Sequence, residues 1–168
     1  MIDIRSDGED KRGVRLSNFP RREFELDGAI CNSLEGFLQA LKASNRTEQV
    51  RICQLVGKEA KLAGHLQNWS GEKVYWRERV MPRRSAEFFE LVCRAYDSAY
   101  HQDPTFARDL LVTGHEELRH TIGRHDPRAT ILTEVEFLCQ LYRLRTRAHF
   151  EVSPQNVVMG LLSDPVAV

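Results

Sequence analysis

The stretch NSLEGFLQALK, residues 32–42, has the pattern of an amphipathic helix. When residues advance by about 100° on a helical wheel, four apolar side chains fall on one stripe. They are Leu34, Phe37, Leu38 and Leu41. Asn32 followed three residues later by Glu35 matches a capping box, in which Glu35 satisfies a backbone N–H at the helix start. The sequence therefore predicts a helix from Asn32 to about Ser44, with its apolar stripe packed against a core.

A second stripe, about 110° from the first, is polar and consists of Glu35, Gln39 and Lys42. Gly36 and Ala40 form a third stripe, where another backbone can approach closely. Glu35 and Lys42 are about 10 Å apart along the axis, which is too far for an i,i+4 ion pair but suits two groups that flank a sugar. By pattern alone Glu35 is a cap and Lys42 a solvated charge. The alternative is that both belong to a site.

Outside this helix, the sequence predicts an α+β fold that is predominantly α-helical, with a few short strands. Alternation around a turn at Asp27-Gly28 predicts a hairpin, and residues 73–76 read as a short strand within a loop from 65 to 84. Cap and periodicity signals predict five further helical segments. They are 47–56 with Thr47 as cap, 57–64, a helix that starts at Ser85, Asp103-Pro104 to Gly114, and one or two turns in HEELRHTIG, residues 115–123.

The last strong helix is TILTEVEFLCQLYRLR, residues 130–145, with Thr130 or Thr133 as its cap. The length of 168 residues favours one domain, which we place at residues 16–150. Residues 1–15 are predicted to be a flexible lead-in, and residues 151–168 a weakly patterned C-terminal tail.

Composition excludes several classes of protein. The formal net charge is zero, which argues against a chain built to coat nucleic acid or an anionic membrane. The N-terminus lacks the apolar region of a signal peptide, and no apolar run approaches the roughly 20 residues of a membrane helix, so we expect a cytoplasmic protein. Four scattered cysteines predict buried free thiols, with Cys93 and Cys139 in the core, rather than a metal site or disulfides. The six histidines are dispersed, and neither a metal nor a cofactor is expected.

Six fragments together resemble the NADAR family, also called YbiA-like, from about residue 16 to residue 147. They are LSNF (16–19), LEGFLQALK (34–42), EAKLAG (59–64), YW (75–76), LLVTGHEEL (110–118) and HTIGRHDPRATILTEVEFL (120–138). Many members have Glu-His where this chain has Glu35-Gly36. Many also have a Trp-Gly segment and an Asn-x-Leu-Gly motif that are absent here, so the chain resembles a particular branch. The resemblance implies an enzyme that processes N-glycosidic bonds to ribose or ADP-ribose.

The resemblance also implies roles for individual residues. It makes Glu35 and Lys42 catalytic, with Lys61 as a rival to Lys42 for the lysine that attacks the anomeric carbon and forms a Schiff base. It places Ser17, Asn18 and Phe19 near the ribose or nucleotide, and Thr130, Thr133 and Glu134 at the start of the last helix, where Thr133 and Glu134 are equally well explained as a cap and a first-turn acid. Gln39, His120 and Gly123 complete this predicted ligand-binding set.

General chemistry adds further candidates. Cleavage of a C–N glycosidic bond requires stabilisation of a cationic sugar carbon and protonation of the leaving base. A lysine becomes a nucleophile when burial or nearby positive charge lowers its pKa. A pyrophosphate would be met by Arg83, Arg84 or a helix N-terminus, although these arginines also fit a solvated surface. Trp69, Tyr75 or Trp76 could stack on a base, although the tryptophans also fit a partial core.

Three hypotheses follow from the resemblance. The first is removal of ADP-ribose from a nucleobase, with guanine in DNA or RNA as the expected substrate. The second is hydrolysis of a phosphoribosylamino-pyrimidine of riboflavin biosynthesis. The third is a module that binds ADP-ribose or NAD without catalysis. In each case the partner is a nucleotide or a nucleic acid rather than a membrane or a metal ion.

Overall fold

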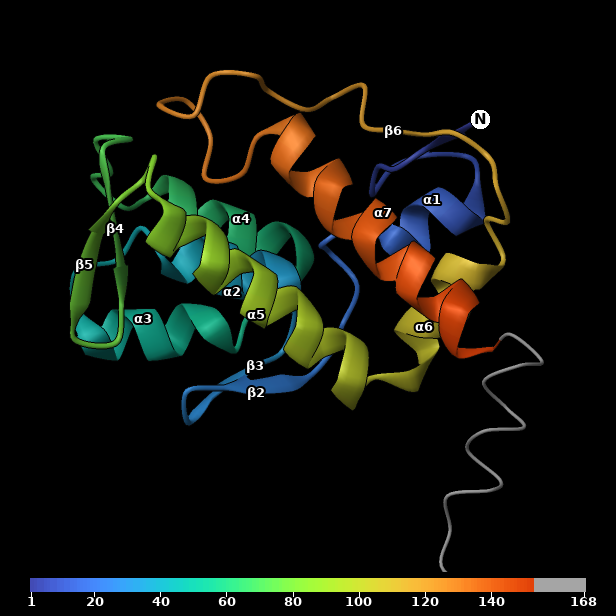
Figure 1. Ribbon diagram of the computed structural model, residues 1–168. Coiled ribbons are helices and arrows are strands. Elements are labelled where there is room, and N and C mark those ends of the chain that lie inside the picture. The colour runs from blue at the N-terminus through green and yellow to red at the C-terminus, as the bar shows by residue number, and fades with distance from the viewer. Residues whose placement is uncertain (153–168) are drawn as a thin grey trace, which may run out of the picture.

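Seven helices and three small two-stranded sheets make up residues 1–152, which are the residues that this computed structural model describes (Figure 1). The helices are α1 (Lys11–Leu16), α2 (Leu34–Ala40), α3 (Arg46–Cys53), α4 (Gly57–His65), α5 (Ala86–Gln102), α6 (Pro104–Leu111) and α7 (Glu134–Glu151). The strands are β1 (Ile2–Asp3), β2 (Phe24–Leu26), β3 (Ala29–Cys31), β4 (Lys73–Trp76), β5 (Arg79–Pro82) and β6 (Leu118–Arg119). The predicted α+β fold, predominantly helical, is confirmed.

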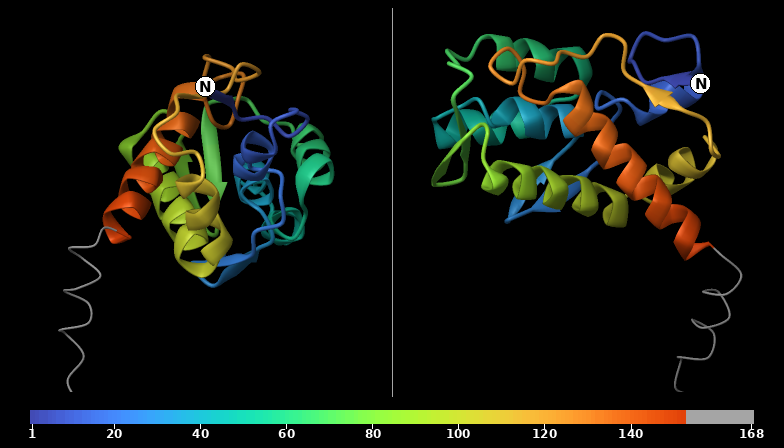
Figure 2. Two further views of the ribbon diagram at one scale, coloured as in Figure 1. Left: turned by 90° about the vertical axis from the view of Figure 1, so that its right-hand side faces the viewer. Right: turned by 45° about the horizontal axis from the view of Figure 1, so that its top comes forward.

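The core lies around α2, which packs against α3, α4 and α5. All seven residues of α2 are buried, and α5 crosses beside it with Phe88, Leu91 and Val92 in the interior. The 45° view in Figure 2 shows α4 and α2 on one side of the molecule and α7 on the other, with α5 running along its lower edge. No helix within residues 1–152 is long and apolar enough to cross a membrane.

Gly36 explains how α2 can lie so close to its neighbour. A Cβ at this position would lie 2.5 Å from the carbonyl oxygen of Leu55 and 2.9 Å from that of Cys53. The predicted stripe of small residues is therefore a contact with the segment that ends α3 and precedes α4. Close backbone packing offsets the roughly 1 kcal/mol by which glycine is less favourable than alanine in a helix.

Several local predictions are confirmed. The hairpin β2–β3 turns at Asp27-Gly28, which both have positive φ, and residues 73–76 form β4 in a second hairpin with β5. Ser85 caps α5, Asp103 caps α6 ahead of Pro104, and residues 57–64 are helical. Of the two caps proposed for the last helix, Thr133 is the correct one, and it forms a capping box with Glu136.

The capping box predicted at Asn32 and Glu35 is wrong. Ser33 is the N-cap of α2, because its hydroxyl accepts a hydrogen bond from the Gly36 N–H at 2.9 Å. The Asn32 amide instead donates to the Gln54 carbonyl at 2.7 Å. The Glu35 side chain is consequently free of a capping role.

The first fifteen residues belong to the fold, which corrects the prediction of a flexible lead-in. Ile2 and Ile4 are completely buried, and β1 pairs in parallel with β6, with Ile2 opposite Leu118. This pairing also corrects the helical turns predicted for residues 115–123, which contain β6. A strand of two residues whose partner lies more than 100 positions away leaves no local periodicity to detect. Of the tail predicted at residues 151–168, the part from residue 153 onward lies outside the described residues.

Three smaller predictions are also corrected. Helix α3 begins after its cap Asn45, not at Thr47, and ends at Cys53, while α6 ends at Leu111. Among the thiols, Cys31 and Cys53 are buried, but Cys93 is only half-buried and Cys139 is exposed.

In α7 the apolar pattern covers more than half of the circumference, so periodicity did not identify which face packs inward.

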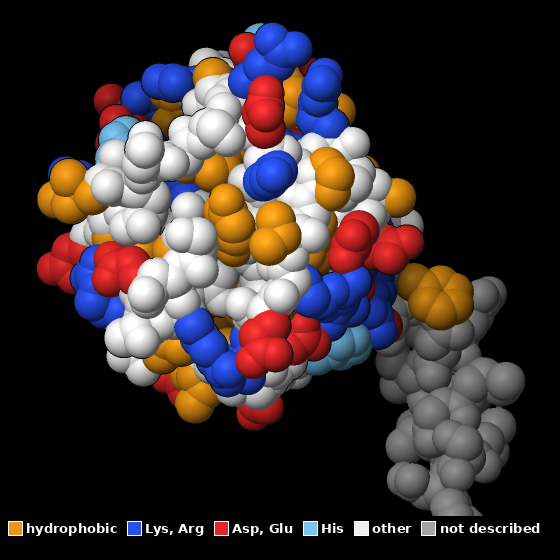
Figure 3. Space-filling view, turned by 90° about the vertical axis from the view of Figure 1, so that its left-hand side faces the viewer, with side chains coloured by type: hydrophobic (Ala, Val, Ile, Leu, Met, Phe, Trp, Pro, Cys, Tyr) orange, Lys and Arg blue, Asp and Glu red, His pale blue; other side chains and the backbone are white. Residues whose placement is uncertain are grey.

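Surface charge is mixed where the β4–β5 hairpin and α3 form one end of the molecule. Figure 3, which looks at this end, shows positive and negative side chains interspersed. Exposed ion pairs such as Arg46–Glu78 and Arg79–Glu87 account for this arrangement, which agrees with the zero net charge.

Candidate active site

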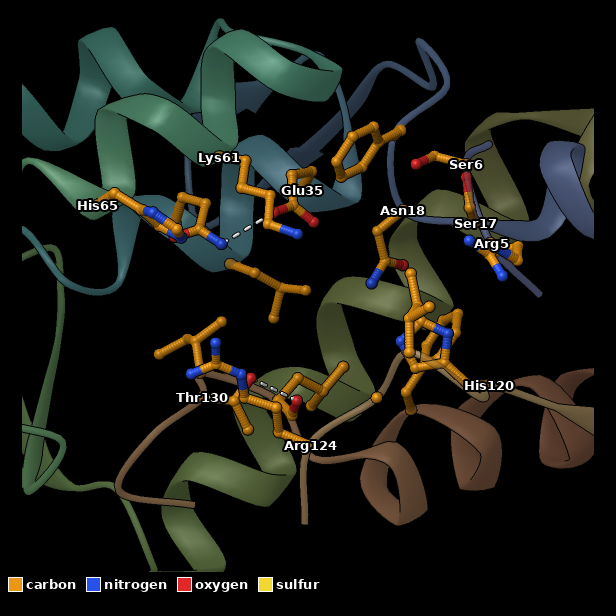
Figure 4. Close-up of a pocket in the computed structure, with 18 of the residues that line it drawn as sticks. Arg5, Ser6, Ser17, Asn18, Glu35, Lys61, His65, His120, Arg124 and Thr130 are labelled. Atoms are coloured by element: carbon orange, nitrogen blue, oxygen red, sulfur yellow. Dashed lines mark hydrogen bonds between the residues drawn. The ribbon is translucent and has the colours of Figure 1, made fainter. Parts of the chain in front are cut away.

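A cavity of about 370 Å³ opens between α2 and α4 on one side and the loop from β6 to α7 on the other (Figure 4). It brings together residues from five separate segments of the chain. Ten of the residues predicted for the site line it. They are Ser17, Asn18, Phe19, Glu35, Gln39, Lys42, Lys61, His120, Gly123 and Thr130.

Glu35 is the single carboxylate among the lining residues and is only 7% exposed. Its backbone N–H donates to the Asn18 carbonyl at 2.9 Å, and its side-chain Oε1 accepts a 2.8 Å hydrogen bond from Gln39 Nε2. Burial raises the pKa of Glu35, and the Gln39 hydrogen bond and the charges of Lys61 and Lys42 oppose that rise. The raised pKa favours the protonated carboxyl group relative to an ordinary glutamate.

Lys42 follows the last turn of α2 and is half-buried in the same cavity. Burial lowers the pKa of the Lys42 amine, and the nearby positive charges of Lys61 and Arg124 act in the same direction, against the attraction of Glu35. Its Nζ lies 5.2 Å from the centre of the Trp69 ring. A lowered pKa increases the fraction of neutral amine, which is the nucleophilic form.

Lys61, on α4, is exposed and lies over the Phe19 ring at 5.7 Å. The predicted rivals thus both line the cavity, but Lys42 is the more buried of the two. Figure 4 shows Lys61 beside Glu35, with His65 farther along the same wall. Within the described residues neither lysine forms a salt bridge.

Asn18 is held in place from outside the cavity. The buried Tyr96 hydroxyl donates to its Oδ1 at 2.8 Å, which leaves the amide N–H₂ of Asn18 available to a ligand. Ser17 is less available, because its hydroxyl donates to the Val14 carbonyl at 2.8 Å and the side chain is 5% exposed. We therefore regard Ser17 as part of the support for Asn18.

Positive groups predominate in the cavity. Arg5, Lys42, Lys61 and Arg124 line it together with two histidines, against the single carboxylate of Glu35. Arg5 is paired with Asp7, whereas Arg124 donates only to the Ala129 carbonyl and has no acidic partner among the described residues. This balance favours a ligand that carries negative charge. Residues 1–152 contain no group of three or more His, Cys, Asp or Glu side chains placed to hold a metal ion.

Two predicted ligand-binding residues lie in the core instead. Trp76 is 1% exposed, packs edge-on against Phe37 at 5.1 Å and donates its indole N–H to Asp27, so it cannot stack on a base. Arg83 is also 1% exposed and forms a two-pronged ion pair with Glu136, so it cannot bind phosphate without breaking that pair.

Thr133 and Glu134 have structural roles and do not line the cavity. Thr133 caps α7, and the Glu134 backbone N–H donates to the Arg124 carbonyl at 3.0 Å. The loop next to them is fixed by Gly123, where a Cβ would lie 2.8 Å from the Glu134 Cβ. These contacts anchor the wall that carries Arg124 and Thr130.

Sequence reasoning missed several lining residues, chiefly Arg5, Ser6, His65, Ile122 and Arg124. Arg5 and Ser6 were assigned to the lead-in. Ile122 and Arg124 lie within the fragment HTIGRHDPRATILTEVEFL but were not singled out there, and His65 has no motif or periodicity that separates it from ordinary surface. Only the pairing of β1 with β6, together with the approach of α4, brings them to the cavity.

The model of a family described as Bacteriophage protein GP30.3 matches residues 12–146. The chain belongs to this family. A relative from Enterobacteria phage T4, an uncharacterized 17.1 kDa protein of the Gp30-rIII intergenic region, is 35% identical over 133 residues, which are 77% of this chain and 88% of the relative. The site residues of this GP30.3-family protein all lie within the matched range except Arg5 and Ser6.

The GP30.3-family chain also shares the fold of YbiA from E. coli. The NMR structure of YbiA aligns with a TM-score of 0.56 over 98% of this chain and 88% of YbiA, at 14% identity. This likeness confirms the predicted YbiA-like fold. The branch suggested by the EGFLQALK and TILTEVEF fragments remains a prediction.

Proposed function

We propose that this protein is an N-glycosidase that removes ADP-ribose from a modified nucleobase, with guanine in DNA or RNA as the expected base. The observation that carries the proposal is that the buried Glu35 and the partly buried Lys42 share one cavity, which is lined otherwise by positive and neutral groups. The diphosphate of ADP-ribose suits the excess of positive charge, and Arg124 takes the phosphate-binding role that the sequence had suggested for Arg83. This substrate implies action in the cytoplasm.

The opposite pKa shifts of Glu35 and Lys42 support a covalent route. Because the pKa of Glu35 is raised and that of Lys42 is lowered, transfer of a proton from the ammonium to the carboxylate costs less than between ordinary side chains. The neutral amine attacks C1′ of the ribose while the C1′–N bond breaks, and its electron pair leaves with the base, which gains a proton. Opening of the C1′–O4′ bond then gives an imine between Nζ and C1′. Addition of water to this imine releases ADP-ribose and regenerates the amine.

Release of free ADP-ribose from an ADP-ribosylated guanine oligonucleotide tests the proposal. The wild-type protein should release ADP-ribose, and Glu35→Gln should lower turnover by about 10²- to 10⁴-fold, as loss of a proton-transfer group does. Lys58→Ala is a matched control, since Lys58 is an exposed lysine of the same helix as Lys61 and does not line the cavity.

The same experiment separates the competing functions. Consumption of a phosphoribosylamino-pyrimidine, without release of ADP-ribose from the oligonucleotide, would replace the proposed substrate with the riboflavin intermediate. Measurable binding of ADP-ribose without turnover of either compound would instead favour a binding module.

A further inference from the structure

His120 is held in one orientation by the N-terminal strand. Its Nδ1 lies 2.5 Å from the Ile4 carbonyl oxygen, and its ring packs edge-on against Phe137 at 4.9 Å between centres. A carbonyl oxygen can only accept a hydrogen bond, so Nδ1 carries the hydrogen. The nitrogen that a ligand can reach is therefore Nε2, which has no hydrogen-bond partner among the described residues.

Strand β1 fixes the segment that carries this histidine through several bonds. The Ile4 N–H donates to the Arg119 carbonyl at 2.7 Å, and the carboxylate of Asp3 accepts hydrogen bonds from both the N–H and the hydroxyl of Thr121. Residues on either side of His120 are thus bound to the first four residues of the chain. This part of the chain precedes residue 12, where the match to the GP30.3 family begins.

Glu35 on α2 and the imidazole of His120 face the cavity from different walls. Figure 4 shows His120 on the wall that also carries Arg124 and Thr130, across the cavity from Glu35. Cleavage of an N-glycosidic bond needs a nucleophile at C1′ and a proton for the leaving base, and these act on different atoms of the substrate. A second titratable group on the opposite wall meets this requirement.

We propose that His120 is the proton donor to the leaving nucleobase and that β1 is the element that positions it. The inference rests on the proposed glycosidase function. As the C1′–N bond breaks, its electron pair passes to the base nitrogen, which takes the proton from His120 Nε2. The neutral imidazole keeps its Nδ1–H on the Ile4 carbonyl and regains a proton at Nε2 from water. His65, the other lining histidine, is exposed and makes no hydrogen bond among the described residues, so it lacks this fixed orientation.

The substitution His120→Asn separates catalysis from structure. The asparagine amide lies where Nδ1 was and can still donate to the Ile4 carbonyl, but nothing replaces Nε2. The proposal predicts that kcat for release of ADP-ribose from the ADP-ribosylated guanine oligonucleotide falls by about 100-fold or more. The melting temperature and the Kd for ADP-ribose should stay close to those of wild type.

Asp3→Ala tests the positioning role of β1. It should lower kcat by about tenfold in the wild-type background and have no further effect in His120→Asn, because coupled residues are not additive. Turnover of His120→Asn within about threefold of wild type would overturn the proposal, as would a loss confined to ADP-ribose binding or an equal effect of Asp3→Ala in both backgrounds. A wild-type protein that releases no ADP-ribose would instead refute the proposed function, and the role of His120 with it.

Discussion

Gln39 donates a 2.8 Å hydrogen bond to Glu35 one helical turn earlier, while its own Oε1 is buried without a partner among the described residues. The absence of a side chain at Gly64, on α4, makes room for this position of the Gln39 side chain. The Oε1 of Gln39 occupies the space where a side chain at position 64 would begin, since a Cβ on Gly64 would lie 1.9 Å from it. A glycine on one helix thus leaves room for the residue that orients the carboxylate on another.

Gly64→Ala should displace Gln39 and disturb Glu35. The new Cβ would also lie 2.6 Å from the Gln39 Cδ, so we expect a loss of about 1–3 kcal/mol in the free energy of unfolding, together with lower turnover. Urea unfolding and the ADP-ribose release assay measure the two effects. Leu62→Ala, on an exposed position of the same helix, should change stability by less than about 0.5 kcal/mol. Wild-type stability and turnover in Gly64→Ala would contradict the role given to Gln39.

Gly36→Ala should destabilise the protein although alanine is the better helix former by about 1 kcal/mol. The added methyl would lie 2.5 Å from the Leu55 carbonyl oxygen, which belongs to the backbone and cannot rotate away. We expect a net loss of about 1–3 kcal/mol in thermal or urea unfolding. Val135→Ala, at an exposed position of α7, serves as the control in which helix propensity changes and stability rises slightly.

The buried carboxyl of Glu35 should make stability depend on pH. Its pKa is raised above the ordinary value of 4.5, so over the interval between the two values the native protein binds more protons than the unfolded chain. The contribution of Glu35 to stability is therefore greatest at low pH and falls as the pH rises through that interval. Glu35→Gln should lose this dependence and gain stability relative to wild type as the pH rises above the ordinary pKa of the carboxyl group. If urea unfolding instead shows that the contribution of Glu35 to stability increases as the pH rises, folding favours the carboxylate form.

Borohydride should trap a sugar adduct on Lys42 rather than on Lys61. The lowered pKa of the Lys42 amine favours attack, and Lys61 is more exposed. Mass spectrometry of the trapped and digested protein locates the adduct. Lys42→Ala should abolish trapping and reduce turnover by about 100-fold or more, whereas Lys61→Ala should chiefly weaken binding of the anionic substrate. Full turnover in Lys42→Ala would eliminate that lysine as the nucleophile.

Arg83→Gln should reduce stability without a direct effect on phosphate binding. Loss of the guanidinium leaves Glu136 without its partner and removes the contact with Phe88, so we expect a cost of about 3 kcal/mol. Arg84→Ala, at the neighbouring exposed position, should change stability little. An unchanged unfolding free energy and a weaker Kd for ADP-ribose in Arg83→Gln would restore the phosphate-binding role that the sequence had suggested.

Residues close together in the chain were sufficient to predict the polar stripe of α2. Helical periodicity placed Glu35, Gln39 and Lys42 on one face, and the structure places all three in the cavity. The small residue at Gly36 likewise predicted a close backbone contact, because periodicity fixes relative direction within a helix whatever the helix packs against. The turn at Asp27-Gly28 and the cap at Ser85 were predictable for the same local reason.

Burial and long-range pairing were decided by the tertiary structure alone. Nothing local distinguishes Arg83, buried against Glu136, from Arg84, which is exposed, or Trp76 in the core from a tryptophan that could stack on a base. The pairing of β1 with β6 joins segments more than 100 residues apart and brings Arg5 and His120 to the site. The sequence by itself determined which groups share a helix face, whereas the packing of distant segments determined their solvation and therefore their pKa values and their chemistry.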